Sequence, residues 1–253
     1  MSEASTGPSA SPPAGVPESR VDSEMLTRAH IFRDLSRDVL ARIEPLSRAL
    51  DVPAQTMLCR QGDLATQLYV LIEGQVTLSN SVQNGISAVV EVVQPGGHFI
   101  LATMLARLPF LMSAHTTTAA RLISIDGEGI LALIQQEPLL ASAILRAEAM
   151  DFGAMVRQVC DLKLRTTAQR LGCYLLDLSK EPADNTVSFR LPFDKRLLAA
   201  RLGCRQENLS RAFAALRTMG VETHGARVIL HDIARLRDYA APNDTSDTVS
   251  IPA

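Results

Sequence analysis

The sequence predicts an α+β protein in which a strand-rich region, a long helix and a mostly helical C-terminal third follow one another. Short apolar stretches separated by turn signals fill residues 51–125. Residues 138–163 instead place apolar side chains three and four positions apart. The final third alternates helical patterns with two short strand patterns. At 253 residues and 47% apolar content, the chain is long enough to bury a substantial core.

The N-terminal segment divides into a tail and a helical region. Residues 1–24 are rich in Ser, Pro, Ala and Gly without an apolar period, so we expect a disordered tail. From Leu26 to Leu50 apolar residues recur at helical spacing. The pattern breaks at Leu35-Ser36, where Ser36 is a suitable cap for a second helix.

Four segments of the strand-rich region have the length, composition and flanking turns of β-strands. They are Tyr69–Ile72, Gln75–Leu78, Ala88–Val93 and Arg121–Ile125. Glu73-Gly74, Pro95-Gly96-Gly97 and Asp126-Gly127 supply the turn signals. Short strands at this spacing indicate an antiparallel sandwich or barrel, which we place at residues 25–137.

Residues 138–163 are predicted to form one amphipathic helix, roughly 39 Å long at 1.5 Å per residue. Its apolar residues at helical spacing are Leu140, Ile144, Ala147, Met150, Ala154 and Met155, followed by Val159 and Leu162. Such a helix can pack against its own barrel or against the same helix of a second copy. The sequence alone favours neither.

The C-terminal third is predicted to contain three helices, a strand and a hairpin. The helices fit 165–179, a segment capped by Asp194 and ending at Gly203, and 206–218. The strand fits 187–191, and the hairpin fits 221–230 with its turn at His224-Gly225. We place this domain at residues 164–241 and a flexible tail at 242–253.

The two helices that flank Gly203 meet the constraints of a helix-turn-helix. Ala199 is a small residue where the helices would cross, and Gly203 tolerates the left-handed conformation that the tight turn requires. Leu209 supplies the inner face of the second helix, with Phe213 and Leu216 continuing its apolar stripe.

The outer face of this second helix offers polar groups that can read DNA. They are Gln206, Glu207, Ser210 and Arg211, all near the helix N-terminus that enters the major groove in this motif. Arginine can bind guanine O6 and N7, and glutamate can accept from a cytosine amino group. The alternative interpretation is a solvated charged helix face without a function.

Charge and composition narrow the class of protein. The net charge is −2, but residues 161–240 hold 14 basic against 9 acidic residues, which favours contact of this part with a polyanion. No run of 18 apolar residues predicts a membrane span, and the first 24 residues do not resemble a signal peptide. We therefore expect a cytoplasmic protein.

Neither a cysteine-based metal site nor an enzyme is expected. Cys59, Cys160, Cys173 and Cys204 are widely spaced and form no ligand set for zinc or a cluster, so we expect free thiols. The sequence contains no GxSxG, P-loop, HExxH or Cys–His constellation.

Two stretches resemble the Crp/Fnr family of transcription regulators. Glu207-Asn208-Leu209-Ser210-Arg211 is similar to the ExxSR motif of its recognition helix, and 60–76 resembles the RxGDxxxxLYxIxxGxV stretch of its sensor domain. The resemblance covers about residues 26–240. It implies a cyclic-nucleotide-binding-like β-roll (a double-stranded β-helix or jelly roll), a long dimerisation helix at 138–163 and a winged helix-turn-helix.

The resemblance also implies a function. Two recognition helices of a homodimer would lie one DNA turn apart on a pseudo-palindromic operator in double-stranded DNA. Glu207, Ser210 and Arg211 match the family's base-contacting positions, and Ser210 implies half-sites similar to TTGA. Arg205 departs from the usual Thr or Ser cap, which weakens the cap by about 1 kcal/mol while offering a phosphate contact. RNA polymerase would be a partner if the protein activates transcription.

The effector region departs from cyclic-nucleotide-binding members of the family. Met112 occupies the position of their phosphate-binding arginine, and no carboxylate lies between Gly96 and Ser113. A buried cyclic phosphate would lack its counter-charge, so we do not expect cyclic AMP to bind. An apolar effector pocket near His98, Phe99, Met112 and Ser113 is expected instead, and the effector is unknown. The segments FILA and LMSA resemble the branch labelled FtrB-like.

Three alternatives stay open. Some relatives of this kind sense nitric oxide or carbon monoxide through haem, for which His98 or His115 are candidate axial ligands, although ordinary roll or surface histidines are the simpler interpretation. The N-terminal cysteine cluster of oxygen-sensing Fnr is absent, and no other metal site is expected. Oxidation of Cys204, in the turn before the recognition helix, could disturb DNA docking. Finally, the chain could be a ligand-binding module that acts by protein contact.

Overall fold

The computed structural model describes residues 15–81, 87–179, 185–192 and 194–241. The chain divides into two compact units, Met1–Ala154 and Met155–Ala253. The tail expected at 242–253 lies outside the described residues.

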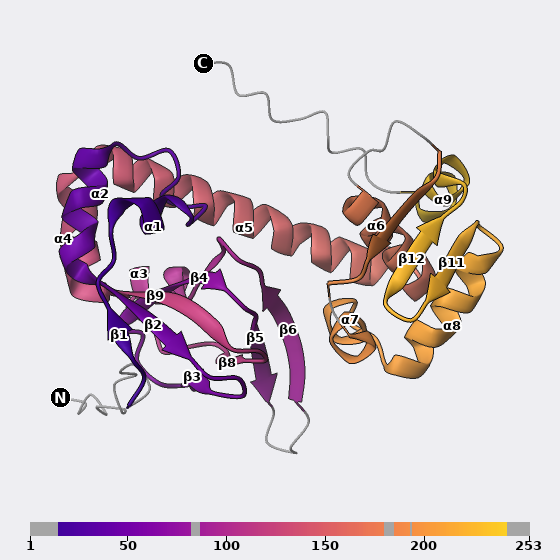
Figure 1. The fold of residues 1–253 in the computed structure, drawn as a ribbon, viewed down its shortest axis with the longest axis horizontal. Coiled ribbons are helices and arrows are strands. Elements are labelled where there is room, and N and C mark those ends of the chain that lie inside the picture. The colour runs from indigo at the N-terminus through magenta and orange to yellow at the C-terminus, as the bar shows by residue number, and fades with distance from the viewer. Residues whose placement is uncertain (1–14, 82–86, 180–184, 193, 242–253) are drawn as a thin grey trace. The chain divides into compact units, whose positions relative to one another are not determined.

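The first unit is built on two antiparallel sheets, as the spacing of short strands predicts (Figure 1). One sheet has the order β1-β2-β9-β4-β7 and the other the order β3-β8-β5-β6. The strands are β1 Glu18–Ser19, β2 Ser47–Val52, β3 Met57–Cys59, β4 Gln67–Glu73, β5 Val76–Ser81, β6 Ser87–Val93, β7 His98–Phe99, β8 Ser113–Thr116 and β9 Ala120–Asp126. The neighbours β4 and β9 are distant in sequence, so the sheet closes by long-range pairing.

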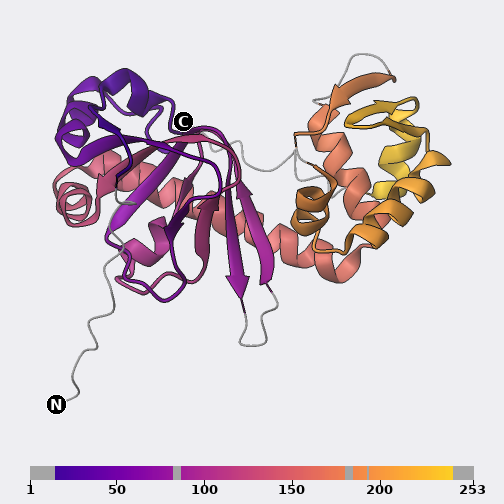
Figure 2. The ribbon, with the colours of Figure 1, turned by 60° about the horizontal axis from the view of Figure 1, so that its bottom comes forward.

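Helices cover the first sheet, and α1 and α2 gather at one end of it (indigo in Figure 2). The helical elements of this unit are α1 Ser23–Thr27, α2 Arg37–Ile43, the 3-10 turn η1 Glu44–Leu46, α3 Leu101–Leu105, α4 Gly127–Gln136 and α5 Pro138–Leu164, which continues into the second unit. The predicted cap at Ser36 is confirmed, since its side chain accepts from the Val39 amide at 3.5 Å.

Two stretches near the N-terminus differ from the sequence expectation. The helical pattern of Leu26–Leu50 ends early, because Ser47 begins β2 and pairs with Ile125 of β9. Residues 15–24, expected in the disordered tail, contain β1, which pairs with β2, and the buried Val21. Long-range sheet pairing and core burial, which a local pattern does not encode, account for both differences.

The core of this unit has two layers, one on each face of the first sheet. Between the sheets, Leu50, Leu71, Val76, Phe99 and Leu122 belong to one apolar cluster. On the helical side a second cluster contains Leu26, Phe32, Leu40, Val70, Ile123, Ile130, Leu140 and Ile144. The start of α5 is therefore anchored on the sheet by the stripe Leu140, Ile144 and Ala147.

Helix α5 confirms the long helix predicted at 138–163, but most of its apolar residues are not buried. Leu140 and Ile144 are buried, whereas Met150 and Met155, expected on the same stripe, are 67% and 63% exposed. A second apolar row also faces solvent, because Leu145 and Phe152 are 70% and 68% exposed. Among the described residues, the helix thus has one face that packs on the sheet and other apolar side chains that are exposed.

The second unit combines helices with a small sheet of order β10-β12-β11. Its elements after α5 are α6 Thr167–Ser179, β10 Val187–Arg190, α7 Lys195–Arg201, α8 Gln206–Arg217, β11 Val221–His224, β12 Arg227–Leu230 and α9 Ile233–Ala240. Their buried residues include Leu171, Leu175, Leu198, Leu209, Leu216, Val228, Leu230 and Leu236. The predicted helices, strand and hairpin are all confirmed here, with shifts of at most two residues at their ends; α9 follows as an additional helix.

Candidate DNA-binding and effector sites

The turn between α7 and α8 has the geometry that a helix-turn-helix requires. The Leu197 amide donates to Asp194 Oδ1 at 2.8 Å, which fixes the start of α7. After α7, Gly203 adopts φ +62° in the left-handed region, and the Cys204 amide donates to the Ala199 carbonyl at 2.9 Å. Ala199 is 2% exposed, so its small side chain lies in the buried part of the motif. The roles predicted for Ala199 and Gly203 are confirmed.

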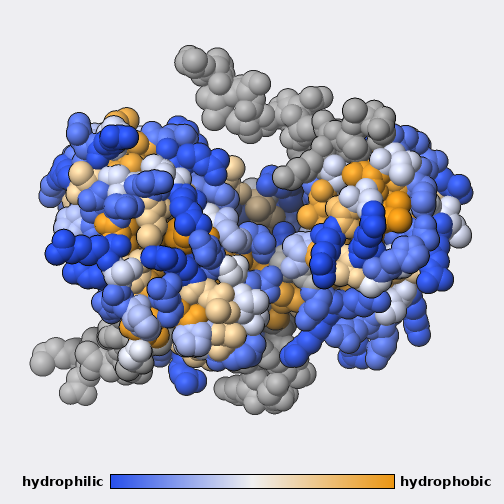
Figure 3. All heavy atoms as spheres, viewed as in Figure 1, coloured by the Kyte–Doolittle hydropathy of each residue, from blue (hydrophilic) through white to orange (hydrophobic). Residues whose placement is uncertain are grey.

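Helix α8 has a buried face and an exposed face. Leu209, Ala212, Phe213 and Leu216 are buried against the rest of the unit. Gln206, Glu207, Ser210 and Arg211 are all exposed in the first half of the helix. The Ser210 hydroxyl donates to the Gln206 carbonyl at 3.0 Å. The surface over α7 and α8, at the lower right of Figure 3, is mainly hydrophilic.

Arg205 occupies the N-cap of α8 without acting as a cap. Its backbone has the extended conformation of an N-cap, but its side chain accepts no hydrogen bond from the helix. A guanidinium has no acceptor atom, so the first amides of α8 remain available to another group. Arg205 directly precedes these amides in the chain, and its side chain is exposed.

The hairpin of β11 and β12 borders a basic hollow. Gly225 turns the chain at φ +61°, and Arg227 Nε donates to Ser188 Oγ of β10 at 2.8 Å. A hollow of about 410 Å³ is lined here by Ser188, Phe189, Arg190, His224, Ala226 and Arg227. On the same hairpin Glu222 lies 2.7 Å from His231 Nε2 and 2.8 Å from His224 Nε2, and these contacts lower the pKa of Glu222.

Phe99 and Met112 of the predicted effector region face the interior of the roll. Phe99 is 3% exposed and stacks on Tyr69 with ring centroids 5.4 Å apart. Met112 packs against the same apolar cluster, and Ser113 Oγ accepts from the Gln61 amide at 3.0 Å. At this position the structure therefore shows an apolar contact of the Met112 side chain.

The backbone beside this region is strained at Ile100. Ile100 has φ +77°, a left-handed conformation that is unfavourable for a β-branched residue. Its carbonyl accepts from the Met104 amide at 3.1 Å and from Thr103 Oγ1 at 2.9 Å, which begins α3. Such backbone strain costs about 1–3 kcal/mol and is common at functional segments. The local sequence does not predict the left-handed conformation of Ile100.

His98 and His115, considered above as haem ligands, both contact other side chains. His98 belongs to the same short strand as Phe99 but faces α5, with Nε2 3.2 Å from Asp151 Oδ2. His115 Nε2 lies 3.0 Å from Thr77 Oγ1, and burial lowers the pKa of His115. Haem ligation by either histidine would require it to leave this contact.

Cys204 lies in the turn between α7 and α8 and is half-buried. Burial raises the pKa of its thiol, and the nearby Arg170 only partly opposes this shift. A raised pKa keeps the thiol protonated, which disfavours reaction with peroxide. Burial also raises the pKa of Cys59 to about 12.

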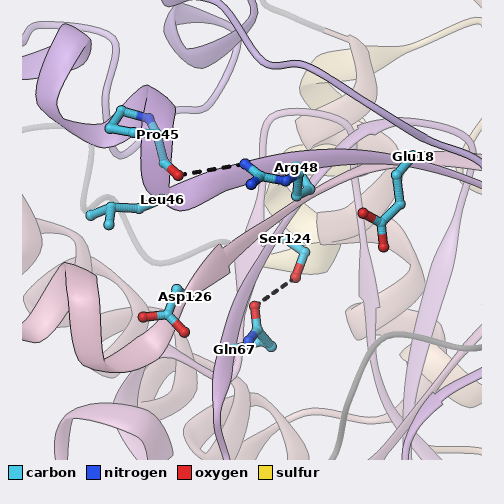
Figure 4. Close-up of a pocket in the computed structure, with 7 residues that line it drawn as sticks. All are labelled: Glu18, Pro45, Leu46, Arg48, Gln67, Ser124 and Asp126. Carbon is cyan, nitrogen blue, oxygen red and sulfur yellow. Dashed lines mark hydrogen bonds between the residues drawn. The ribbon is translucent and has the colours of Figure 1, made fainter.

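A further hollow of about 390 Å³ lies on the surface of the first sheet (Figure 4). Its lining consists of Glu18, Pro45, Leu46, Arg48, Gln67, Ser124 and Asp126. Ser124 Oγ donates to Gln67 Oε1 at 2.9 Å within it. None of the predicted effector residues lines this hollow.

Two family models match the two units. The cyclic nucleotide-binding domain model matches residues 49–137, and the Crp-like helix-turn-helix model matches residues 169–239. Among the described helices, none combines the length and apolar character that crossing a bilayer demands.

Similar proteins align with most of the chain. A CRP-like cAMP-activated global transcriptional regulator of Mycobacterium tuberculosis is 23% identical, over 84% of this chain and 97% of the relative. Two solved structures are similar over 87% of this chain. A regulatory protein of Silicibacter pomeroyi classed as cAMP-binding is 30% identical, with 98% of it covered and a TM-score of 0.58.

The second of these solved structures is that of a Ruegeria pomeroyi protein classed as cyclic nucleotide binding. It is 29% identical to this chain, with 97% of it covered and a TM-score of 0.59. The FtrB-like branch is not confirmed by these comparisons. The sensor roll, the exposed polar face of α8 and the two matching domain models agree: the chain belongs to the Crp/Fnr family of transcription regulators, with a cyclic-nucleotide-binding-type domain and a DNA-binding Crp-like helix-turn-helix.

Proposed function

We propose that the protein is a homodimeric regulator that reads a pseudo-palindromic operator through α8. The observation that carries this proposal is the row of exposed polar side chains on the first half of α8, opposite a fully buried face. A helix held in this way can enter the major groove without losing contacts to its own unit. Its N-terminal half is the part that reaches base edges in this motif.

Each exposed residue of α8 has a chemically distinct role in this proposal. Arg211 pairs with guanine O6 and N7, because its guanidinium can donate two parallel hydrogen bonds. Glu207 accepts from a cytosine amino group, which is the role that tolerates a carboxylate near phosphates. Ser210 supports a half-site similar to TTGA. Gln206 has donors and acceptors for a neighbouring base.

Arg205 and the wing, which is the sheet of β10, β11 and β12, are assigned to the phosphate backbone. Arg205 is an exposed cation at the N-cap of α8, where no side chain caps the first amides, and this arrangement suits a phosphate. On the wing, the exposed Arg190 and Arg227 flank the hollow described above. These contacts fix the position of α8 on the duplex and carry no sequence information.

The dimer is proposed to form along α5. Leu145, Ala149, Phe152, Val156 and Val159 follow one another at alternating intervals of four and three residues, which is the spacing of a coiled-coil seam. All five are exposed in the single chain. A second copy of the same helix is the partner that this self-complementary row fits best.

The effector is proposed to be a molecule other than cyclic AMP, or none. Relatives from Mycobacterium tuberculosis and Haemophilus influenzae are named as cAMP-activated regulators. In this chain, however, Met112 packs in the apolar cluster and the segment from Gly96 to Ser113 has no carboxylate for the ribose. A cyclic phosphate would be buried without a counter-charge.

Selection from a pool of random DNA duplexes tests the proposal. Purified native protein should enrich inverted half-sites whose centres lie about 10 base pairs apart, as two recognition helices one turn apart require. Its affinity for the enriched duplex should fall steeply with salt concentration. Enrichment of no inverted repeat would refute the proposed mode of DNA reading.

A further inference from the structure

A small cluster of side chains that can bind a metal lies between strand β7 and helix α5. It consists of His98, Glu148 and Asp151, each of which offers one ligand atom within 4.8 Å of the others. All three belong to the first unit. The proposed reading of DNA through α8 does not involve these three residues.

His98 is held rigidly and points its free nitrogen into the cluster. Its strand pairs with β4, with His98 opposite Val70. The preceding turn is packed by His30, whose amide donates to the Gly96 carbonyl at 2.8 Å. The His98 side chain is only 9% exposed, yet its Nε2 atom has no hydrogen-bond partner within the described structure.

The contact between His98 and Asp151 does not satisfy that nitrogen. Nε2 lies 3.2 Å from Asp151 Oδ2, but no hydrogen bond joins these two atoms. A buried nitrogen without a partner costs free energy. The distance instead resembles the separation of two ligands on one ion, about 3.0–3.4 Å when each bond is about 2.1 Å.

Helix α5 places its two carboxylates where its buried stripe would continue. Leu140, Ile144 and Ala147 pack on the sheet, and the next position of this stripe is Asp151. Glu148 lies three residues before Asp151, so both side chains project on the same side of the helix. Ligands at positions i and i+3 of a helix recur in the metal sites of helical proteins.

The charges around the cluster favour a cation. Glu148 and Asp151 place two carboxylates within 4.8 Å of the His98 imidazole. Two carboxylates beside an unpartnered imidazole are stabilised by a bound positive ion.

We propose that His98, Glu148 and Asp151 bind one divalent first-row transition-metal ion, which joins β7 to α5. One imidazole and two carboxylates form a nitrogen and oxygen ligand set that favours ions such as Zn²⁺ and Mn²⁺ over Mg²⁺. Asp151 is 60% exposed, which leaves a route for the ion and room for water ligands.

Zn²⁺ titration of the full-length, chelator-treated protein against a chromophoric chelator tests the proposal. Native protein should bind one equivalent per chain at this site, and Mg²⁺ in large excess should not displace it. His98→Gln and Asp151→Asn should each weaken this binding by more than about tenfold, since even loss of an outer-shell partner of a metal costs 10- to 100-fold. Asp151→Asn changes an exposed side chain and should leave the fold intact.

The wing supplies the matched control, because Glu222, His224 and His231 also combine imidazole with carboxylate. His231→Gln should leave the equivalent assigned to His98 unchanged. Bound Zn²⁺ should also slow amide hydrogen exchange in β7 and in the first half of α5. Undiminished Zn²⁺ binding by both His98→Gln and Asp151→Asn, or loss of all Zn²⁺ binding in His231→Gln alone, would overturn the proposal.

Discussion

Replacement of Gly203 by alanine tests how the turn of the helix-turn-helix is built. Gly203 has φ +62°, and a Cβ added there would lie 2.7 Å from Leu162 Cδ2. The left-handed conformation costs an L-residue about 1–2 kcal/mol. Moving the Leu162 side chain away from its rotamer costs about 0.5–1.5 kcal/mol more. We therefore expect Gly203→Ala to lower the free energy of unfolding of the second unit by roughly 1.5–3.5 kcal/mol.

Gly225→Ala is the matched control for the conformational part of this cost. Gly225 has nearly the same φ, +61°, but nothing lies within 4 Å of an added Cβ. Gly225→Ala should therefore cost only the about 1–2 kcal/mol of the left-handed conformation. In a Leu162→Ala background, Gly203→Ala should fall to the same cost, because the atom it meets has been removed.

Hydrogen exchange of the most protected amides in α6 and α8, followed by mass spectrometry, measures these differences for the second unit separately. One or two kcal/mol corresponds to about a 5- to 30-fold faster exchange. If Gly203→Ala is no more destabilising than Gly225→Ala in the native background, the contact with Leu162 is not formed. If neither substitution costs more than about 0.5 kcal/mol, the left-handed turns are assigned wrongly.

The remaining predictions concern the cap of α8, the dimer seam, the effector and a buried thiol. Arg205→Ser should stabilise the second unit by about 0.5–2 kcal/mol through a new cap. The same substitution should lower the salt dependence of DNA binding by about one ion, and an unchanged salt slope would contradict the proposed contact between Arg205 and a phosphate. Phe152→Glu should yield monomers in size-exclusion chromatography with light scattering, because burial of roughly 100 Å² of this side chain on each copy contributes about 5 kcal/mol to the dimer. The control Met150→Glu should remain dimeric, since Met150 lies on another side of α5 and is 67% exposed. Cyclic AMP at 1 mM should leave the melting temperature unchanged, and a rise would contradict the view that the apolar contact of Met112 leaves a cyclic phosphate without a counter-charge. The pKa of Cys59 is raised from 9.0 to about 12, so the thiol of the unfolded chain ionises first as the pH rises. Stability that is present below pH 9 should therefore be lost above it, by up to about 1.4 kcal/mol per pH unit from this thiol. Cys59→Ala should reduce that slope in urea unfolding measured from pH 8 to 10.

The second unit was the part most readily predicted from the sequence. Its signals are local: Asp194 caps a helix, Gly203 occupies a left-handed turn, and Leu209 to Leu216 form one stripe. Each depends on residues within a few positions of one another. Helices and a tight turn are encoded at this range, so the structure reproduces their bounds closely.

The first unit was predicted only in outline, because its order depends on distant pairing. The helical spacing of apolar residues extends to Leu50, yet Ser47–Val52 forms the strand β2 between β1 and β9. The two-residue strand β7 carries no alternating pattern, and its place is fixed by pairing with β4. The two faces of α5 were likewise not separable, since residues with the same spacing either meet the sheet or remain exposed.

The candidate sites were predictable to different degrees. The exposed positions on α8 follow from the buried stripe on its opposite face. The cluster of His98, Glu148 and Asp151 was missed, although Glu148 and Asp151 have a recognisable i, i+3 spacing. Their histidine comes from a strand about 50 residues earlier, and only the fold brings it beside the helix.

The most direct test of DNA reading compares Arg211→Ala with Arg217→Ala on the selected operator and on its single-base variants. Both arginines are exposed on α8, but Arg217 ends the helix, away from its N-terminal half. Arg211→Ala should lose about 1–3 kcal/mol of specific binding and relax the preference at one base pair of each half-site. Arg217→Ala should keep the native preference at every position. Unchanged affinity and unchanged base preference in Arg211→Ala would contradict the account.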